Sequence, residues 1–330
     1  MEETSSSVAD DLAVSLARFA GRTFHHADFD AGDLVRRKDA QGLTVSVVIP
    51  ARNEEGRVGR VARILREALV DDVPLVDDLL VVDGDSTDAT AVEAAAAGVR
   101  VLRQSRILPE AGSASGKGEA LWKGLAATTG DLVVFVDADI EDIDARFVAG
   151  LLGPLLTDPG VAFVKATYDR PLRFGDELRP GGGGRVTELL ARPLLATFWP
   201  ELSWLAQPLS GEYAGRRPLL ESLPFVRGYG IELAMLVDIA DRHGVDVIAQ
   251  VDLDVRVHEN QPIDALGRMA SEILQVAMQR LSAQGRMVLT DPPASLLAQP
   301  VRDGAGDLAL SHVEISPSER PPLAEWRAAR

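Results

Sequence analysis

The chain has 330 residues and 46% of them are hydrophobic, enough for one large core or two smaller ones. It has no cysteine, which excludes disulfides, thiolate metal sites and a cysteine nucleophile. A net charge of −16 argues against nucleic acid or an anionic membrane as partner, so a site for an anionic ligand must be locally positive. No stretch approaches the roughly 18 apolar residues of a membrane span, and the acidic N-terminus does not resemble a signal peptide, so we expect a cytoplasmic protein.

The first 170 residues predict strands that alternate with helices. Residues 1–42 show no clear period, and we interpret them as a short helix and an extended arm. Residues 44–50 are rich in β-branched side chains and predict a buried strand, followed by a helix for which Asn53 is a good N-cap. Further strands are expected at 76–88, 99–102, 131–139 and 160–170, with helices at 86–98 and 116–130. Such alternation predicts a parallel sheet between two layers of helices.

The pattern changes after Arg170. A glycine-rich loop leads into a helix, and a segment punctuated by Gly and Pro follows. We expect a helix at 228–244, one or two strands at 245–260 and a long helix at 263–281, whereas the last 40 residues look irregular and tail-like. The long helix carries a broad apolar stripe, which fits either ordinary core packing or an interface with a second copy: Leu266, Met269, Ala270, Ile273, Ala277 and Leu281.

Polar clusters follow three of the predicted strands, as "PARNEE", "DGDSTD" and "DADIED". Ligands of open parallel sheets bind beyond the carboxyl ends of the strands, so these clusters favour one common site. In the last cluster Asp137 and Asp139 stand one residue apart after an apolar strand, a pattern suited to a divalent cation such as Mg²⁺ or Mn²⁺ and to a ribose. A solvated acidic turn is the alternative for this motif alone.

Two glycine-rich segments precede predicted helices. Lys117 lies between two glycines at a helix N-terminus, where backbone N–H groups favour an anion; the motif is not a Walker A, and an exposed lysine in a plain turn is the alternative. The stretch "GGGGRVTEL" offers Arg185 as a bidentate clamp for a carboxylate or phosphate, with Thr187 at the helix start. A disordered linker would explain its glycines but not a helix that opens with Arg and Thr.

The second half adds candidates that are weaker one by one. His258 ends an apparent strand, and a lone histidine is more often structural, but it is a candidate to complete the shell of a cation at the D-x-D pair. Arg256 and Asn260 share its face if the strand continues. Short Gly-rich turns hold four side chains suited to sugar hydroxyls, although a turn followed by a helix cap explains them equally well: Glu212, Tyr213, Tyr229 and Glu232.

The order "SVVIPARNEE", "VVDGDSTDAT", "VVFVDAD" resembles that of nucleotide-sugar glycosyltransferases with the GT-A fold. The segments "GKGEALWKGLAATTGD", "GGGGRVTELLARPLL", "QPLSGEYAGRR", "GYGIELAMLVD" and "VHENQP" are closely similar to the actinobacterial glucosyl-3-phosphoglycerate synthases and their mannosyl relatives, over roughly residues 42–285. This resemblance implies an α/β fold with a mostly parallel, Rossmann-like sheet flanked by helices, a C-terminal acceptor-binding part and a helical extension. It divides the chain into an N-terminal arm (1–42), a nucleotide-sugar-binding region (43–170), an acceptor-binding region with the long helix (171–285) and a C-terminal tail (286–330).

The resemblance also implies a reaction, the transfer of glucose or mannose to the 2-hydroxyl of 3-phosphoglycerate with retention of configuration. The donor would be UDP-glucose, GDP-mannose or GDP-glucose, and the cofactor Mg²⁺ or Mn²⁺. We see no carboxylate to name as a covalent nucleophile, so our hypothesis is a same-face mechanism in which the diphosphate takes the acceptor proton; a trapped glycosyl-enzyme adduct would exclude it. A homodimer is implied, and a compatible solute, glucosylglycerate or mannosylglycerate, as the end of the pathway.

Residue roles follow from the same resemblance. The nucleotide and donor site would comprise Pro50, Ala51, Asn53, Glu54, Asp85 or Ser86, Lys117, Asp137 and Ala138, with Leu209, Tyr229 and Glu232 around the hexose. The position of Ala138 is often Ser in relatives, which matters little if the flanking carboxylates do the work. The acceptor would bind at Gly184, Arg185, Thr187 and Asn260, and the metal at Asp139 and His258. The catalytic group would be Lys117, Asp139, Arg185 and Glu232.

Three other functions fit the sequence less well. Sugar nucleotidyltransferases need a G-x-x-x-R loop after the first strand, where this chain has "PARNEEG". Haloacid-dehalogenase phosphatases need Thr or Val where this chain has Glu141. A catalytically inactive nucleotide-sugar-binding protein is possible for any such fold, but intact Asp139, Arg185 and His258 argue against it. The sequence leaves glucose or mannose, and UDP or GDP, open.

Overall fold

The computed structural model describes residues 13–112, 114–170, 172–174, 177–179, 184–257, 262–302, 304 and 306–330. Its centre is an eight-stranded sheet with the strand order β1-β11-β6-β9-β5-β2-β3-β4. All neighbouring pairs are parallel except those that β9 makes with β5 and β6. The strands are β1 (Thr23–His25), β2 (Val45–Ala51), β3 (Asp78–Asp83), β4 (Arg100–Arg103), β5 (Leu132–Phe135), β6 (Phe163–Asp169), β9 (Tyr213–Arg216) and β11 (Ile248–Val255).

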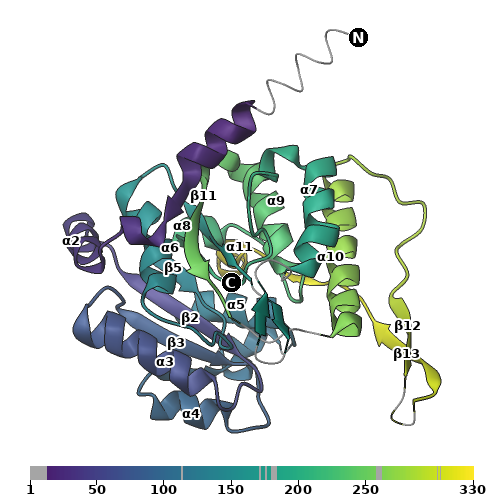
Figure 1. The fold of residues 1–330 in the computed structure, drawn as a ribbon, viewed down its shortest axis with the longest axis horizontal. Helices are drawn as coiled ribbons and strands as arrows, with labels where there is room; N and C mark the ends of the chain where they lie inside the picture. The colour runs from purple at the N-terminus through teal and green to yellow at the C-terminus, as the bar shows by residue number, and fades with distance from the viewer. Residues whose placement is uncertain are drawn as a thin grey trace.

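Helices cover both faces of this sheet, and each face has its own apolar cluster (Figure 1). On one face lie α2 (Ala31–Gln41), α3 (Val58–Arg66), α4 (Thr90–Ala96) and α6 (Arg146–Thr157). On the other lie α5 (Lys117–Ala127), α7 (Arg192–Phe198), α8 (Arg217–Glu221), α9 (Ile231–His243) and α10 (Ile263–Ala283). The expectation of a mostly parallel sheet between helical layers is confirmed.

Several local expectations were wrong. Asn53 is not a helix cap: it has a left-handed φ of 56°, and α3 begins only at Val58. The segment that was interpreted as Gly/Pro-punctuated turns contains β9, a strand in the middle of the sheet. Residues 23–25 of the expected arm form an edge strand of the same sheet.

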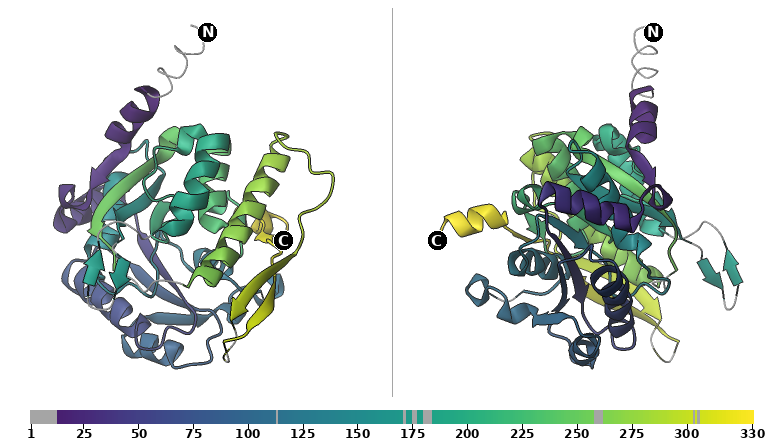
Figure 2. Two further views of the ribbon diagram at one scale, coloured as in Figure 1. Left: turned by 45° about the vertical axis from the view of Figure 1, so that its right-hand side comes forward. Right: turned by 90° about the vertical axis from the view of Figure 1, so that its left-hand side faces the viewer.

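The last 40 residues are not irregular, as we had expected. They form an antiparallel hairpin of β12 (Leu296–Arg302) and β13 (Leu308–Glu314), then β14 (Glu319–Arg320) and α11 (Leu323–Ala328). β14 pairs with β10 (Phe225–Val226), which fastens this segment to the body. A second hairpin consists of β7 (Leu172–Phe174) and β8 (Glu177–Arg179), and both hairpins stand out from the body in Figure 2.

The apolar stripe of α10 is used mainly for core packing. Ile273, Ala277 and Leu281 are buried, and the other three stripe residues are partly buried against the same cluster. Ile263 and Leu274, which lie outside the stripe, remain exposed. Within the described residues, no helix has the length and apolarity to cross a membrane.

A buried ion pair holds the C-terminal segment against α5. Arg320 donates from Nε and Nη2 to the two carboxylate oxygens of Glu119, both at 2.6 Å, and Glu119 is fully buried. The same guanidinium donates to the carbonyls of Ala111 and Gly112. Trp122 adds a hydrogen bond from its indole to the carbonyl of Pro321. These contacts tie the chain terminus to the helix that begins at Lys117.

We expect R320M to destabilise the fold by about 3–5 kcal/mol, because it leaves the buried carboxylate of Glu119 without its bidentate partner. Urea unfolding followed by circular dichroism measures this. R327M is the matched control, since Arg327 forms a half-exposed pair with Glu221 in the same segment, and its loss is expected to cost about 1 kcal/mol or less. Equal effects of the two variants would contradict the prediction.

Candidate active site

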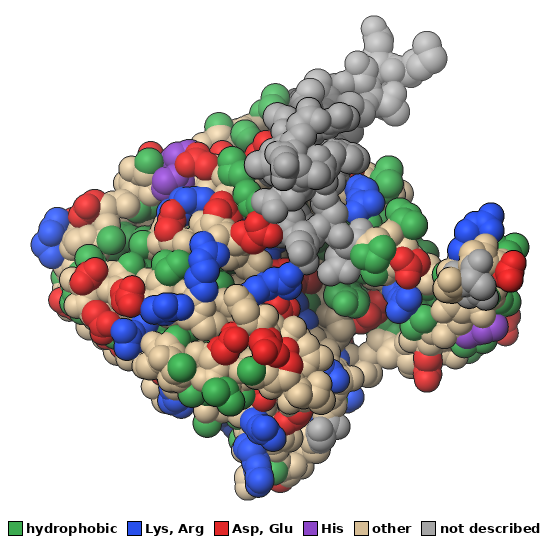
Figure 3. Space-filling view, turned by 60° about the horizontal axis from the view of Figure 1, so that its bottom comes forward, with side chains coloured by type: hydrophobic (Ala, Val, Ile, Leu, Met, Phe, Trp, Pro, Cys, Tyr) green, Lys and Arg blue, Asp and Glu red, His purple; other side chains and the backbone are tan. Residues whose placement is uncertain are grey.

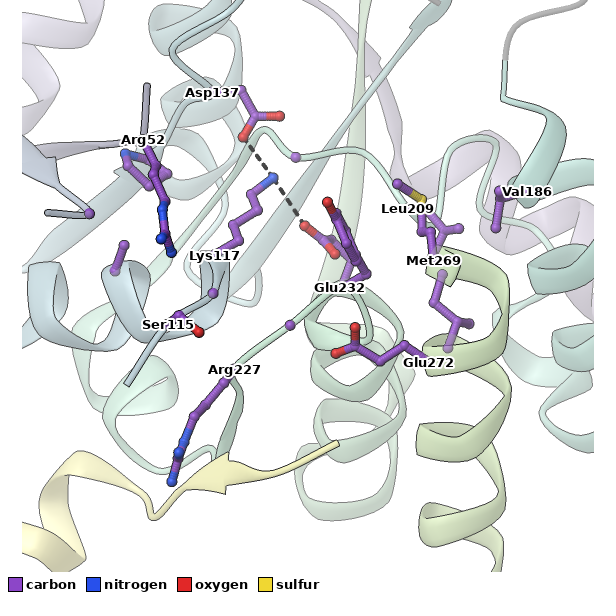
Figure 4. A pocket seen from close by; sticks show the side chains of 18 of the residues that line it. Arg52, Ser115, Lys117, Asp137, Val186, Leu209, Arg227, Glu232, Met269 and Glu272 are labelled. Carbon is purple, nitrogen blue, oxygen red and sulfur yellow. Dashed lines mark ion pairs between the residues drawn. The ribbon is translucent and has the colours of Figure 1, made fainter. Parts of the chain in front are cut away.

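The polar ends of β2, β3 and β5 meet the start of α5 around one cavity of about 940 Å³ (Figure 4). The structure brings thirteen of the predicted site residues to its wall: Pro50, Ala51, Glu54, Lys117, Asp137, Ala138, Asp139, Gly184, Arg185, Thr187, Leu209, Tyr229 and Glu232. They come from segments far apart in the sequence, so the wall depends on the topology of the sheet. Their individual roles stay predictions.

Two close backbone approaches require glycine. A Cβ on Gly118 would lie 1.8 Å from the carbonyl oxygen of Val226, because the first turn of α5 rests directly on β10. A Cβ on Gly211 would lie 2.1 Å from Oδ2 of Asp137 and 2.5 Å from Nζ of Lys117. The glycines of "GKG" and "LSG" therefore allow the backbone to press against the charged groups of the site.

Lys117 joins two carboxylates. Its Nζ lies 2.6 Å from Oδ1 of Asp137 and 3.2 Å from Oε1 of Glu232, as the dashed lines in Figure 4 mark. Burial alone would raise the pKa of Asp137, but Lys117 and then Arg256 offset it and hold that pKa at about 2. Burial lowers and the two carboxylates raise the pKa of Lys117, with a net result well above its usual value. Both groups of the pair are therefore charged at neutral pH.

Arg256 is the second buried cation and contacts three carboxylates. It is 2% exposed, and its Nη2 lies 3.1 Å from Oδ1 of Asp139, 3.4 Å from Oδ2 of Asp137 and 3.1 Å from Oε1 of Glu212. Glu212 is fully buried and accepts a 2.6 Å hydrogen bond from the hydroxyl of Tyr168. Sequence analysis noticed Arg256 and Glu212 but gave them no role at the aspartates.

Lys165 is a third buried cation that the sequence did not single out. It is 1% exposed, its Nζ donates to the carbonyl oxygen of Ser210, and it lies 4.6 Å from the ring centre of Tyr213. Burial lowers the pKa of Lys165 to about 7, although Glu232 and Glu212 act in the opposite direction. Its hydrogen bond holds the loop whose Leu209 and Gly211 line the cavity.

The opposite wall of the cavity contains the start of a helix. Arg185 and Val186 open a continuous helical stretch that ends with α7 at Phe198, and the N–H of Glu188 donates to the carbonyl of Gly184. Gly184 has a φ of 72°, and Thr187 is 1% exposed. A helix N-terminus beside an arginine is a favourable place for an anion.

The cavity is electrically balanced although the chain carries a net charge of −16. Among the described residues, the six carboxylates in its wall are Glu54, Asp137, Asp139, Glu232, Glu272 and Glu314, and the six basic groups are Arg52, Lys117, Arg170, Arg185, Arg227 and Arg256. Arg52, Arg170, Arg227, Glu272 and Glu314 were not predicted. Arg52 lies inside "PARNEE", and Arg227 directly precedes "GYGIELAMLVD".

Five predicted residues are not part of the described wall. His258 and Asn260 lie outside the described residues. Asn53, Asp85 and Ser86 join loops instead: Ser86 Oγ accepts a hydrogen bond from the Asn53 backbone, and Ser105 Oγ donates to Asp85. These contacts steady the loops behind the nucleotide side, and a direct contact with nucleotide stays a prediction for all three.

One further cluster lies outside the cavity lining, where β1 forms the edge of the sheet. Nε2 of His25 and Nε2 of His26 lie 2.9 and 2.7 Å from the two oxygens of Asp254. The backbone N–H of Ala27 donates to Nδ1 of His25, so Nε2 carries the proton in the neutral ring and acts as a donor. A metal-binding histidine normally donates through its other nitrogen, so we interpret this cluster as a link between β1 and β11 rather than a metal site.

Residues 46–181 match the model of the glycosyl transferase family 2. The chain is 46% identical to glucosyl-3-phosphoglycerate synthase of Petrotoga mobilis over 92% of this chain and 93% of that protein. Crystal structures of mannosyl-3-phosphoglycerate synthase from Rubrobacter xylanophilus and glucosyl-3-phosphoglycerate synthase from Mycobacterium tuberculosis superpose with TM-scores of 0.85 and 0.80, at 39% and 42% identity. They cover 94% and 93% of this chain, and 98% and 99% of their own chains are matched. The chain belongs to the glucosyl-3-phosphoglycerate synthase family.

The lowered pKa of Lys165 predicts a pH-dependent stability. Between pH 7 and about 10 the unfolded chain holds a proton on this lysine that the folded chain has released, so stability rises with pH across this window. We expect the free energy of unfolding of the wild type, relative to K165M, to rise by up to about 1.4 kcal/mol per pH unit there. Urea titrations of both proteins at pH 6, 7, 8 and 9 measure the difference, and a constant difference would contradict it.

Proposed function

We propose that this chain transfers a hexose from a nucleoside diphosphate sugar to the 2-hydroxyl of 3-phosphoglycerate, with retention and with a divalent cation. The observation that carries the proposal is one cavity that holds the D-A-D pair, Lys117 and the helix start at Arg185. The M. tuberculosis relative was crystallised with Mn²⁺, UDP and glucosyl-3-phosphoglycerate, which are a cation, a leaving group and a product of this reaction. Among the possible donors we favour UDP-glucose on this ground, ahead of GDP-glucose and GDP-mannose.

On the donor side the chain supplies a fixed positive charge. Breaking the bond at the anomeric carbon builds negative charge on the departing diphosphate. Lys117 stands at the start of α5, charged and held by Asp137 and Glu232, and it already points into the cavity. Its orientation requires no rearrangement when the charge develops.

The residues present fit a divalent cation at Asp139. Its side chain is 40% exposed, and the described residues give its Oδ2 no hydrogen-bond donor. Carboxylate oxygen is a preferred ligand of Mg²⁺ and Mn²⁺. The second proposed ligand, His258, lies outside the described residues. When bound, the cation supplies Lewis-acid stabilisation for the leaving diphosphate.

On the acceptor side we propose that Gly184, Arg185, Thr187 and Asn260 hold 3-phosphoglycerate. Supporting observations are the helix start at Arg185 and the buried Thr187 beside it. An acceptor with a phosphate and a carboxylate is best stabilised by backbone N–H groups and a guanidinium. The electrical balance of the cavity wall lets this anion enter a strongly acidic protein.

We further propose a homodimer that forms through the β12–β13 hairpin. One face of this hairpin exposes Leu296, Ala298, Pro300, Leu308 and Leu310, and Pro300 pairs with Leu310 across the strands. The hairpin stands out at the right of the molecule in Figure 3. A two-stranded hairpin has marginal stability alone and gains most from packing its apolar face against a second copy.

We also propose that the protein is cytoplasmic and that it acts in a pathway to a compatible solute.

The reaction is tested by release of nucleoside diphosphate from UDP-glucose, GDP-glucose and GDP-mannose, each with and without 3-phosphoglycerate. We expect release to require 3-phosphoglycerate and Mg²⁺ or Mn²⁺. D139N should lower kcat by about 10²–10³-fold because it weakens the stabilisation of the leaving group. Release that is independent of 3-phosphoglycerate for every donor would contradict the proposed acceptor.

The dimer is tested by light scattering after gel filtration. We expect the wild type to run at twice the chain mass and L308D/L310D at the mass of one chain, because charge on the apolar face opposes its burial. V92D is the matched control, since Val92 is an equally exposed apolar residue on α4. A monomeric wild type, or a dimeric L308D/L310D, would exclude this interface.

A further inference from the structure

The two aspartates of the D-A-D pair differ sharply in how their oxygens are used. Oδ1 of Asp137 is held by Lys117 at 2.6 Å and its Oδ2 faces Arg256 at 3.4 Å, so cations occupy both sides. In Asp139, Arg256 occupies Oδ1 at 3.1 Å, while the described residues leave Oδ2 without a donor. One guanidinium thus touches both carboxylates and leaves a single oxygen available.

The backbone fixes the position of this guanidinium. Arg256 follows β11, and its N–H donates to the carbonyl of Asp169 at the end of β6. The N–H of Val257 donates to Asp142 Oδ1, and the carbonyl of Val257 accepts from the N–H of Glu141. Two chain segments therefore hold residues 256–257 from both sides. Glu212, itself hydrogen-bonded to Tyr168, lies 3.1 Å from the same Nη2 that faces the two aspartates and adds a third negative charge around it.

We infer that Arg256 is a positioning residue of the D-A-D pair. By contacting Asp137 and Oδ1 of Asp139, it keeps these carboxylate oxygens from binding the cation. Asp139 is thereby left to bind the cation through Oδ2 alone. This inference rests on the proposed function only in taking a divalent cation as cofactor. Arginine suits the task because its guanidinium stays charged when buried, whereas the pKa of a lysine shifts readily on burial.

A consequence follows for the free enzyme. Arg256 places a positive charge beside the cation site and occupies two oxygens that a cation would otherwise take. It therefore weakens the binding of a cation that arrives without nucleotide. A nucleoside diphosphate adds its own oxygens and negative charge, so the cation binds best together with the donor.

The test is a titration with Mn²⁺ in the absence of nucleotide, in which the electron paramagnetic resonance signal of unbound Mn²⁺ measures affinity. We expect R256M to bind Mn²⁺ at least about tenfold more tightly than the wild type, because it removes a unit charge a few ångströms away and frees two carboxylate oxygens. R256K should lie between the two. Unchanged or weaker Mn²⁺ binding by R256M would overturn the inference.

A second set of variants controls for misfolding, because R256M leaves the buried Glu212 without its cationic partner. In E212Q/R256M both members of the pair are neutral, a change that proteins tolerate better than the loss of one partner, and E212Q is its parent. We expect the same gain in Mn²⁺ affinity when R256M is added to E212Q. R170M serves as control, since Arg170 lines the cavity and stacks on Tyr168 without a described contact to either aspartate; a gain as large as that of R256M would show a general charge effect and overturn the inference.

The outcomes separate this inference from the proposed function. If the wild type binds no Mn²⁺ even with UDP present, the proposed cofactor is wrong and the inference falls with it. If the wild type binds Mn²⁺ with UDP and transfers hexose, but R256M and the double variant match their parents in Mn²⁺ affinity, the inference alone is wrong.

Discussion

The arrangement of the site depends on buried and partly buried carboxylates that are held by cations at ion-pair distance. Asp137 and Glu212 are acceptable in a closed wall because Lys117 and Arg256 lie within ion-pair distance of them. Each partner is delivered by a different element: β5 ends at the D-A-D pair, α5 begins at Lys117, and β11 leads into Arg256. Any change in strand order would separate them, so the topology of the sheet and the chemistry of the site are one constraint.

The same ion pairs bear on how so acidic a protein can bind anionic ligands. A chain with a net charge of −16 has to admit a sugar nucleotide and a phosphorylated acid. Its cavity wall contains equal numbers of acidic and basic side chains, and two of the cations are already committed to carboxylates. Positive potential for the ligands can then come from Arg52, Arg170 and Arg227, from the helix start at Arg185 and from the proposed divalent cation. This explains why a metal-dependent design suits such an acidic chain.

The sequence predicted the parts of the site that are encoded locally. Apolar strands followed by polar clusters identify β2, β3 and β5, and a lysine between glycines marks the start of α5. β9 was not predicted because its four residues lie in a stretch rich in Gly and Pro. They form a strand through their pairing with β5 and β6. The contacts of Arg256 with the two aspartates could not be predicted, since they depend on the register of β11 against β6. Lys165 looked like an interruption of an apolar strand, although it is buried and bonded to the loop of Ser210.

The C-terminal segment shows how a late part of the chain completes an early site. β13 runs without a break into residues 315–318, which line the cavity, and β14 then pairs with β10 beside Arg227. Arg320 forms a bidentate ion pair with Glu119, two residues after Lys117, so the same segment also restrains the helix that begins at Lys117. A hairpin that packs against a second copy would therefore be joined, through one continuous stretch of backbone, to both the cavity wall and the start of α5. The surface proposed for association is therefore connected directly to the wall of the site proposed for transfer, although most residues of that site lie much earlier in the sequence.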